Sequence, residues 1–255
     1  MDVFVSQFIL YLLLFARITS MIVVAPIVGH QAIPVQVKVS LGMFLAFVMF
    51  PLLSVKSPQM DVQLLELVVL LLQEVAVGLL IGFAAGLLFA GVHYAGEIIA
   101  LHMGLSFANI IDPESNQSNP VIGQLLYLTT LLIFLVLNGH HFLIQALHLS
   151  YTAVPIGAFV FSMPAAKTLA SLAGLVFVIG VKFSAPILVA IFLNNVGFAI
   201  LARVMPQMNI FSISFPLNIG VGLLVLMSTA PLVVYVFKKS LESFEYNILE
   251  LINVL

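Results

Sequence analysis

Long apolar stretches, separated by short groups of Pro, Gly and polar residues, dominate the pattern along this chain. Five stretches contain no Asp, Glu, Lys or Arg: 18–37, 75–96, 115–166, 183–202 and 204–237. They lack the period-2 alternation of strands in a membrane barrel, and within lipid only helices and closed barrels satisfy every backbone group. The pattern therefore predicts an all-α membrane protein. At roughly 20 residues per span, the chain has material for about six spans.

Helix boundaries are predicted from the Pro, Gly and Asn residues between the stretches. Helices are expected over 3–24, 36–50, 62–105, 121–137, 142–154, 168–203 and 217–237. The turn Asn138–Gly139 is expected to join two of them in a hairpin, because Asn-Gly is a strong turn signal. Pro155, Gly157 and Pro164 are expected to close that hairpin.

Two of the expected helices are much longer than one membrane crossing, and Pro or Gly is expected to break them. Over 62–105 a bend is expected near Gly91–Gly96. The helix over 168–203 is interrupted by Lys182, Pro186 and Asn194–Asn195, and Met205–Pro206 ends it, because the residue before Pro is pushed out of the helical region.

The last segment, 238–255, is predicted to be an amphipathic helix. Its apolar residues recur at helical spacing, and its acids lie off that stripe. The apolar residues are Leu241, Phe244, Ile248, Leu251 and Leu255, and the acids are Glu242, Glu245 and Glu250. The helix either covers the protein's own core or docks against a partner.

Composition agrees with a single membrane-embedded domain over residues 1–255. Of the residues 63% are hydrophobic and 7% are charged, whereas about 25% are charged in an ordinary soluble domain. The chain has no Cys, which excludes disulfides and thiolate metal sites. The formal net charge of -2 gives no reason to expect binding to nucleic acid.

Seven polar residues lie within or beside the apolar stretches: Arg17, Glu74, Glu97, Lys182, Asn194, Asn195 and Arg203. A charge at mid-bilayer costs about 2.5 to 3.5 kcal/mol, so these side chains are not expected to face lipid. They pair within the helix bundle, as Arg17 and Glu74 can do, or they face a watery lumen or partner proteins.

Three glycines, Gly78, Gly82 and Gly86, repeat every four residues along one helix face. Each costs about 1 kcal/mol relative to Ala in a soluble helix. Close backbone contact with another helix compensates for this cost, as in small-xxx-small packing. The neighbouring helix is either from the same chain or from a partner.

No motif for catalysis is complete, so the sequence predicts neither an enzyme nor a cofactor. His93 and Glu97 share a helix face, as do His141 and His148, but no His-Glu-x-x-His pair is present. Gly104–Ala108 lacks the last Gly of a nucleophile elbow, and no Gly-x-x-x-x-Gly-Lys phosphate loop occurs. No metal site is expected.

One short string, Met205-Pro206-Gln207-Met208-Asn209-Ile210-Phe211, resembles the signature of the FliR/SctT family of the bacterial type III export gate. Pro206, Gln207, Asn209 and Phe211 carry the motif after a long apolar helix. Other landmarks of the family follow in order along the chain: Phe15-Ala16-Arg17 with Pro26, Gln73-Glu74 with Gly78 and Gly82, Ala95-Gly96-Glu97, Gly104 with Asp112-Pro113, Gly139-His140-His141, and Ser150 with Pro155 and Gly157.

The resemblance implies a helical assembly with FliP and FliQ, and with the large gate subunit FlhB, in the inner membrane at the flagellar basal body. Unfolded flagellar proteins would pass through the central pore of this assembly. In that family the chain contributes helical hairpins to a spiral that lies largely above the bilayer, so six spans would misstate the topology.

The polar segment 106–120, SFANIIDPESNQSNP, interrupts the apolar pattern midway. From the residues alone, a surface connection between helices is favoured. The resemblance instead implies that the loop 109–120 plugs the pore, and its extended length of about 40 Å folds out and back over about 20 Å. The implied plug residues are Phe107, Asn109, Ile110, Ile111, Asp112, Pro113, Glu114, Asn116, Gln117, Asn119 and Pro120.

Two other functions remain open at this point. A small-molecule secondary transporter explains the intramembrane charges and the helix breaks at Pro186 and Pro206, although no internal repeat is found. The homologous subunit of a virulence injectisome shares the family resemblance. Intramembrane hydrolysis lacks its motifs.

Overall fold

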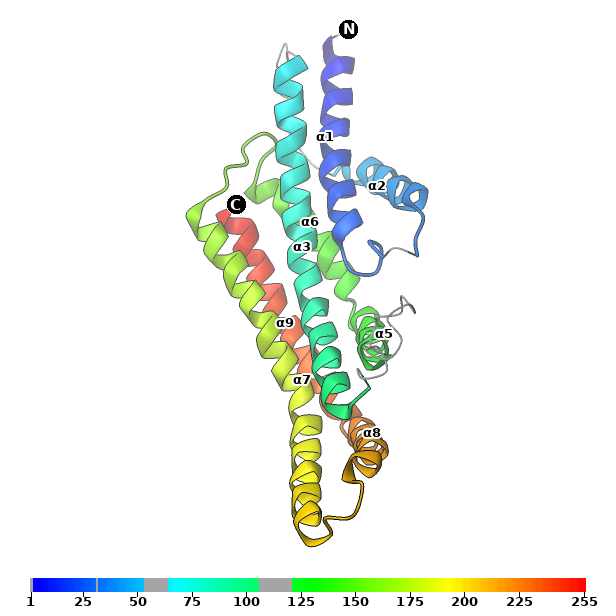
Figure 1. Cartoon of the computed structure of the whole chain (residues 1–255). Helices are drawn as coiled ribbons and strands as arrows, with labels where there is room; N and C mark the ends of the chain where they lie inside the picture. Colours follow the sequence, from blue (N-terminus) through cyan, green and yellow to red (C-terminus); the bar gives the residue numbers. More distant parts are fainter. Residues whose placement is uncertain (1, 31, 53–63, 106–120) are drawn as a thin grey trace. The chain divides into compact units, whose positions relative to one another are not determined.

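The computed structural model describes residues 2–30, 32–52, 64–105 and 121–255, and every regular element in these ranges is an α-helix. The helices are α1 (Asp2–Val24), α2 (Val35–Met49), α3 (Leu64–Met103), α5 (Val121–Val136), α6 (Gly139–Ala153), α7 (Met163–Val204), α8 (Ile210–Ser228) and α9 (Ala230–Val254) (Figure 1). The predicted all-α class is confirmed.

The helices form two compact units. Unit 1 comprises Met1–Leu87, Asn138–Ala173 and Ser243–Leu255, and unit 2 comprises Leu88–Leu137 and Gly174–Glu242. The boundaries between the units fall inside α3, α7 and α9, so each of these three helices contributes to both units. The single domain expected from the sequence stays a prediction.

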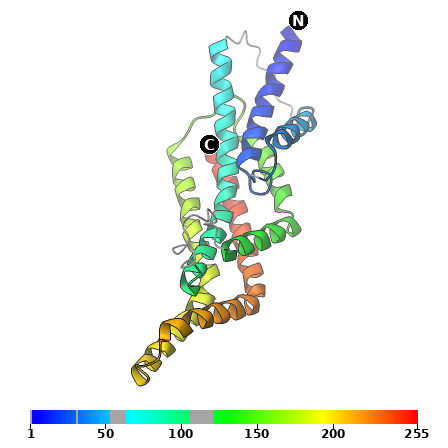
Figure 2. The ribbon, with the colours of Figure 1, turned by 45° about the vertical axis from the view of Figure 1, so that its right-hand side comes forward.

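In unit 1, α1 lies along the first half of α3 (Figures 1 and 2). Leu13, Leu14 and Ile18 of α1 are completely buried, as is Ile81 of α3. The second helix, α2, packs against α1, where the Tyr11 hydroxyl donates to the carbonyl oxygen of Met43 at 3.1 Å. The apolar pattern of α1 thus buries one of its faces within its own chain.

In unit 2, the buried ring of Phe89 on α3 forms the centre of an aromatic cluster. It makes edge-to-face contacts with Tyr127 and Phe134 of α5 and with Phe237 of α9, at centroid distances of 5.8, 5.4 and 6.0 Å. Such pairs add about 0.5–1.5 kcal/mol to the area they bury. The cluster therefore fixes α5 and the first part of α9 against α3.

The helix α3 continues through Gly91–Gly96 without interruption, and the bend expected there stays a prediction. The glycines allow close packing within unit 2. A Cβ on Gly91 would lie 2.9 Å from the Cβ of Ile179 on α7, and one on Gly96 would overlap Gly123 of α5.

The start of α7 lies earlier than the predicted residue 168. The hydroxyl oxygen of Ser162 accepts a bond from the Ala165 N–H at 3.1 Å, which is the geometry of a helix N-cap. Pro164, expected to close the preceding unit, lies in the first turn of α7, where its missing N–H costs nothing. The helix continues through Pro186 to Val204.

The predicted helix 217–237 is wrong as a single element. Two helices, α8 and α9, meet at Thr229 with a bend of 61°. Pro231 is the second residue of α9, where its missing N–H costs nothing, but in one continuous helix it would remove the bond to the Met227 carbonyl oxygen, so the helix breaks just before it. The Thr229 hydroxyl at the break donates to the Val225 carbonyl oxygen at 2.7 Å. The amphipathic segment expected at 238–255 is the second part of α9.

The apolar stripe of that segment is buried within the chain. Leu241, Phe244, Ile248 and Leu251 are at most 3% exposed, while Glu242 and Glu250 are exposed. This burial supports a helix that covers the protein's own core, rather than one held free for a partner.

Three described helices, α1, α3 and α7, are long and apolar enough to cross a membrane. The bent pairs α5 with α6 and α8 with α9 raise the number to at most five if each pair is one span. The composition-based figure of six is too high, because α3 and α7 contain 40 and 42 residues, about twice the length of one crossing.

Candidate functional site

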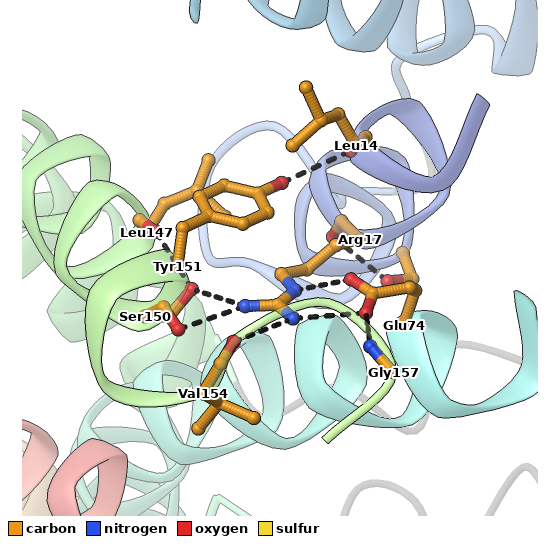
Figure 3. Close-up of polar contacts among 9 residues, drawn as sticks. Leu14, Arg17, Glu74, Leu147, Ser150, Tyr151, Val154 and Gly157 are labelled. Carbon is orange, nitrogen blue, oxygen red and sulfur yellow. Dashed lines mark hydrogen bonds and ion pairs between the residues drawn. The ribbon is translucent and has the colours of Figure 1, made fainter. Parts of the chain in front are cut away.

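A completely buried pair of opposite charges lies within unit 1 (Figure 3). Arg17 of α1 donates from Nε to Oε2 of Glu74 on α3 at 2.6 Å, and from Nη2 to Oε1 at 3.1 Å. Two parallel bonds of this kind form the bidentate fork in which guanidinium and carboxylate interact most strongly. Of the alternatives for these two polar residues, the structure bears out the pair inside the bundle.

Arg17 also binds the C-terminal end of α6. Its Nη1 donates to the carbonyl oxygen of Ser150 at 2.9 Å and to the Ser150 hydroxyl at 3.3 Å, and its Nη2 donates to the carbonyl oxygen of Val154 at 3.1 Å. The end of a helix carries partial negative charge and carbonyls without intrahelical partners. Arg17 therefore caps α6 from another helix.

These contacts use every N–H donor of the Arg17 guanidinium, which has five. The ring of Tyr151 covers its remaining face, with the ring centroid 4.4 Å from Cζ. No donor is left for a substrate. Arg17 therefore cannot bind the substrate of a secondary transporter, the function considered as an alternative.

Glu74 and Tyr151 extend the centre to other parts of unit 1. The N–H of Gly157, in the connection after α6, donates to Oε1 of Glu74 at 3.3 Å, and the Tyr151 hydroxyl donates to the carbonyl oxygen of Leu14 at 3.2 Å (Figure 3). The charge centre, defined as Arg17, Glu74, Ser150 and Tyr151, joins α1, α3 and α6. Removing one partner of such a buried pair costs about 3–5 kcal/mol.

The glycine stripe of α3 packs against α1. A Cβ on Gly78 would overlap the Arg17 carbonyl oxygen and the Ser20 hydroxyl, and a Cβ on Gly82 would lie 2.7 Å from the Met21 carbonyl oxygen. At Gly86 the nearest atom is 4.0 Å away. The neighbouring helix at the first two positions is therefore in the same chain.

The two asparagines of α7 belong to a second polar group, in unit 2. The side-chain amide of Asn194 donates to Oδ1 of Asn218 on α8 at 2.7 Å, and the amide of Asn218 donates to Oδ1 of Asn195 at 3.1 Å. Asn218 is 8% exposed. Asn218 was not predicted as part of this group; it is an amide within the apolar helix expected over 217–237, but nothing in the sequence links it to α7.

The structure does not bring the other three polar residues into either group. Glu97, Lys182 and Arg203 are exposed on α3 and α7. Glu97 lies 3.6 Å from Nε2 of His93 one helix turn earlier. The seven residues therefore do not form one site. Two form the buried ion pair, two belong to the hydrogen-bonded asparagine group, and three are exposed charges.

Buried Lys38 is a further charge that sequence analysis missed. It is 7% exposed, and its Nζ donates to the carbonyl oxygen of Gly29 at 2.8 Å. Among the described residues, no three His, Cys, Asp or Glu side chains gather where a metal ion could be held.

The motif 205–211 covers the connection between α7 and α8, residues 205–209, and the first two residues of α8. Pro206, Gln207 and Asn209 are exposed, and the Met208 N–H donates to the Met205 carbonyl oxygen at 3.1 Å. A helix end followed by a Pro-containing turn is what the string predicted. The exposed polar side chains leave this turn accessible to a neighbouring molecule.

The expected plug residues, Phe107 and Asn109 to Pro120, lie outside the described residues, but the two helices that bracket them are described. Gly104 ends α3 with φ of +84°, and the Leu105 N–H donates to the Ala100 carbonyl oxygen at 3.0 Å, as in a Schellman cap. The contact of Gly96 with Gly123 holds α5 beside α3. The two helices on either side of the segment are therefore packed together.

Comparison with known proteins matches residues 8–244 to the family described as bacterial export proteins, family 1. The flagellar biosynthetic protein FliR of Bacillus subtilis (strain 168) is 32% identical, with 100% of each chain covered. That of Escherichia coli (strain K12) is 34% identical over 91% of this chain and 88% of its own. That of Aquifex aeolicus (strain VF5) is 30% identical over 94% and 92%.

Proposed function

The chain belongs to the FliR family of bacterial export proteins, and from this premise we propose that it is a non-enzymatic subunit of the flagellar type III protein export gate. The observation that carries the proposal is the full-length match to the Bacillus subtilis protein. The match extends over all of both chains, so it is not confined to one motif. The gate lies in the bacterial inner membrane at the flagellar basal body.

The exposed surface supports an assembly with other gate subunits. Phe177, Phe192 and Leu193 of α7 and Met227 of α8 are each more than 60% exposed. Large apolar side chains exposed in this number need a cover of protein or lipid. FliP and FliQ cover part of this surface, FlhB contacts the assembly, and together they form a spiral around a pore for unfolded flagellar proteins.

Charged and amide groups on the same helices favour protein neighbours over lipid tails. Lys182, Asn195 and Arg203 are exposed on α7 among these apolar side chains. Facing hydrocarbon, each charge would cost about 2.5–3.5 kcal/mol. A polar neighbour or a wet lumen removes that cost.

The segment 109–120 closes the pore when no substrate is passing. Its composition supports this, because eight of the twelve residues are Asn, Gln, Asp, Glu or Ser near the two prolines Pro113 and Pro120, and polar side chains suit a wet lumen. The close packing of Gly96 against Gly123 holds together the two helices that flank the segment. Opening then costs little, since a polar segment leaving a wet constriction loses few buried contacts.

Deletion of residues 109–119 tests this closure. The ion conductance of gates assembled with the shortened chain is expected to rise above that of the wild-type gate, because the obstruction is removed. Planar-bilayer recording or a membrane-potential dye measures it. A control deletion of equal length in the segment 53–63 leaves the conductance unchanged. Unchanged conductance for the 109–119 deletion in an assembled gate would rule out the plug.

A further inference from the structure

A strip of α3 in unit 2 combines an exposed carboxylate with apolar side chains. Ala90, Glu97 and Leu101 are all exposed, and their spacing of seven and four residues places them on one helix face. The Glu97 side chain is 52% exposed and Leu101 is 60% exposed. The strip is thus apolar except for one acid and the neighbouring His93.

No Lys or Arg of the described residues forms an ion pair with Glu97. The sequence has no Lys or Arg between Lys56 and Lys167, so neither the rest of α3 nor the segment that follows it can supply one. The cations of unit 2 are Lys182, Arg203, Lys238 and Lys239, and among the described residues none forms an ion pair with Glu97. Glu74, by contrast, has Arg17 from its own chain.

His93 does not form a close hydrogen bond with Glu97. Its Nε2 lies 3.6 Å from the Glu97 carboxylate, beyond good hydrogen-bond length, so the carboxylate keeps room for a closer donor. Exposure to hydrocarbon is unfavourable for the charge, whereas Leu101 gains by burial against an apolar neighbour. An apolar helix that carries one cation would both pair with Glu97 and bury Leu101.

We propose that the strip Ala90, Glu97 and Leu101 docks an apolar helix of a neighbouring subunit that carries a Lys or Arg opposite Glu97. This rests on the proposed function, because it names the chemistry of one contact inside the gate assembly. Ala90 leaves room for close approach of the helices. The exposed carboxylate can accept an ammonium or a bidentate guanidinium.

Neutralisation and reversal of the charge test this contact in the full-length chain, expressed with the other gate subunits in the native membrane. Glu97→Gln and Glu97→Lys are expected to lower the fraction of chain in the high-mass complex on native gels, the reversal by about tenfold or more, because truncating one partner of a desolvated charge pair weakens binding strongly. Glu242→Gln and Glu242→Lys, at an exposed acid of α9 in the same unit, are matched controls that leave the fraction unchanged.

Second-site revertants of Glu97→Lys, selected for restored assembly, identify the partner residue. The expected class replaces a Lys or Arg on an apolar helix of another subunit by Asp or Glu. Equal levels of variant and wild-type chain in the membrane establish that folding is intact. Wild-type assembly of both Glu97 variants overturns the docking, and so do revertants confined to this chain.

The same gels separate this proposal from the one on which it rests. If Glu97→Gln assembles normally but changes conductance, Glu97 faces the lumen and the docking contact is wrong while the gate subunit stands. If the wild-type chain itself enters no complex, the proposed function fails instead.

Discussion

At the residue scale, Arg17 combines three contacts that ordinarily need separate side chains. It forms a fork with Glu74, caps α6 at Ser150 and Val154, and lies against the ring of Tyr151. Lys cannot replace it, because an ammonium has three donors on a single point where guanidinium has five in a plane. The positions of the two charges are also not interchangeable, because only a hydrogen-bond donor can face the carbonyl oxygens of α6.

Charge exchange at this pair is therefore expected to fail. In the double variant Arg17→Glu with Glu74→Arg, a carboxylate would face the carbonyl oxygens of Ser150 and Val154. The free energy of unfolding is therefore expected to fall by about 3–5 kcal/mol, as it does when a buried pair is broken. Thermal unfolding of the detergent-solubilised chain measures it. Lys182→Gln, at an exposed cation, is the control with little change, and recovery to wild-type stability in the double variant would contradict the capping role.

At the element scale, the packing of α3 on α1 depends on Gly78 and Gly82. Gly78→Ala is expected to destabilise the chain, because its Cβ overlaps the Arg17 carbonyl oxygen and this exceeds the gain of about 1 kcal/mol in helix propensity. Gly86→Ala, with 4.0 Å to the nearest atom, is expected to be neutral or stabilising. Thermal unfolding compares the two, and equal effects at both positions would contradict the α1 contact.

The sequence predicted helices well where apolar patterns ended in strong local signals. The helix predicted over 3–24 corresponds to α1, and the one predicted over 36–50 corresponds to α2. The break at Thr229 and the early start of α7 at Met163 each coincide with a proline in the first turn of the following helix, Pro231 and Pro164. Pro164 also fits the end of the preceding hairpin, and Pro231 lies inside an apolar run, so these boundaries were missed.

The candidate site was predicted only as a set of residue types. Arg17 and Glu74 are unusual in apolar helices, which made an ion pair one of the expected possibilities. Their partner Ser150 lies 133 positions from Arg17, and no periodicity links positions so distant. Asn218 was missed for the same reason, since its partners are on another helix.

At the scale of the whole molecule, the described residues contain three to five candidate spans and much exposed apolar surface. Both features are those of a membrane protein whose apolar surface is covered by lipid or by other polypeptides. The buried charge centre supports unit 1 from within, and the exposed charges of α3 and α7 remain for contacts outside the chain.

The central claim, that this chain is a subunit of the flagellar export gate, is tested most directly by flagellin secretion. In a strain that lacks only this chain, flagellin in the culture medium is expected to fall below detection while its cytoplasmic level persists, because the conduit is incomplete, and expression of the wild-type chain restores it. Normal flagellin secretion without the chain would contradict the claim.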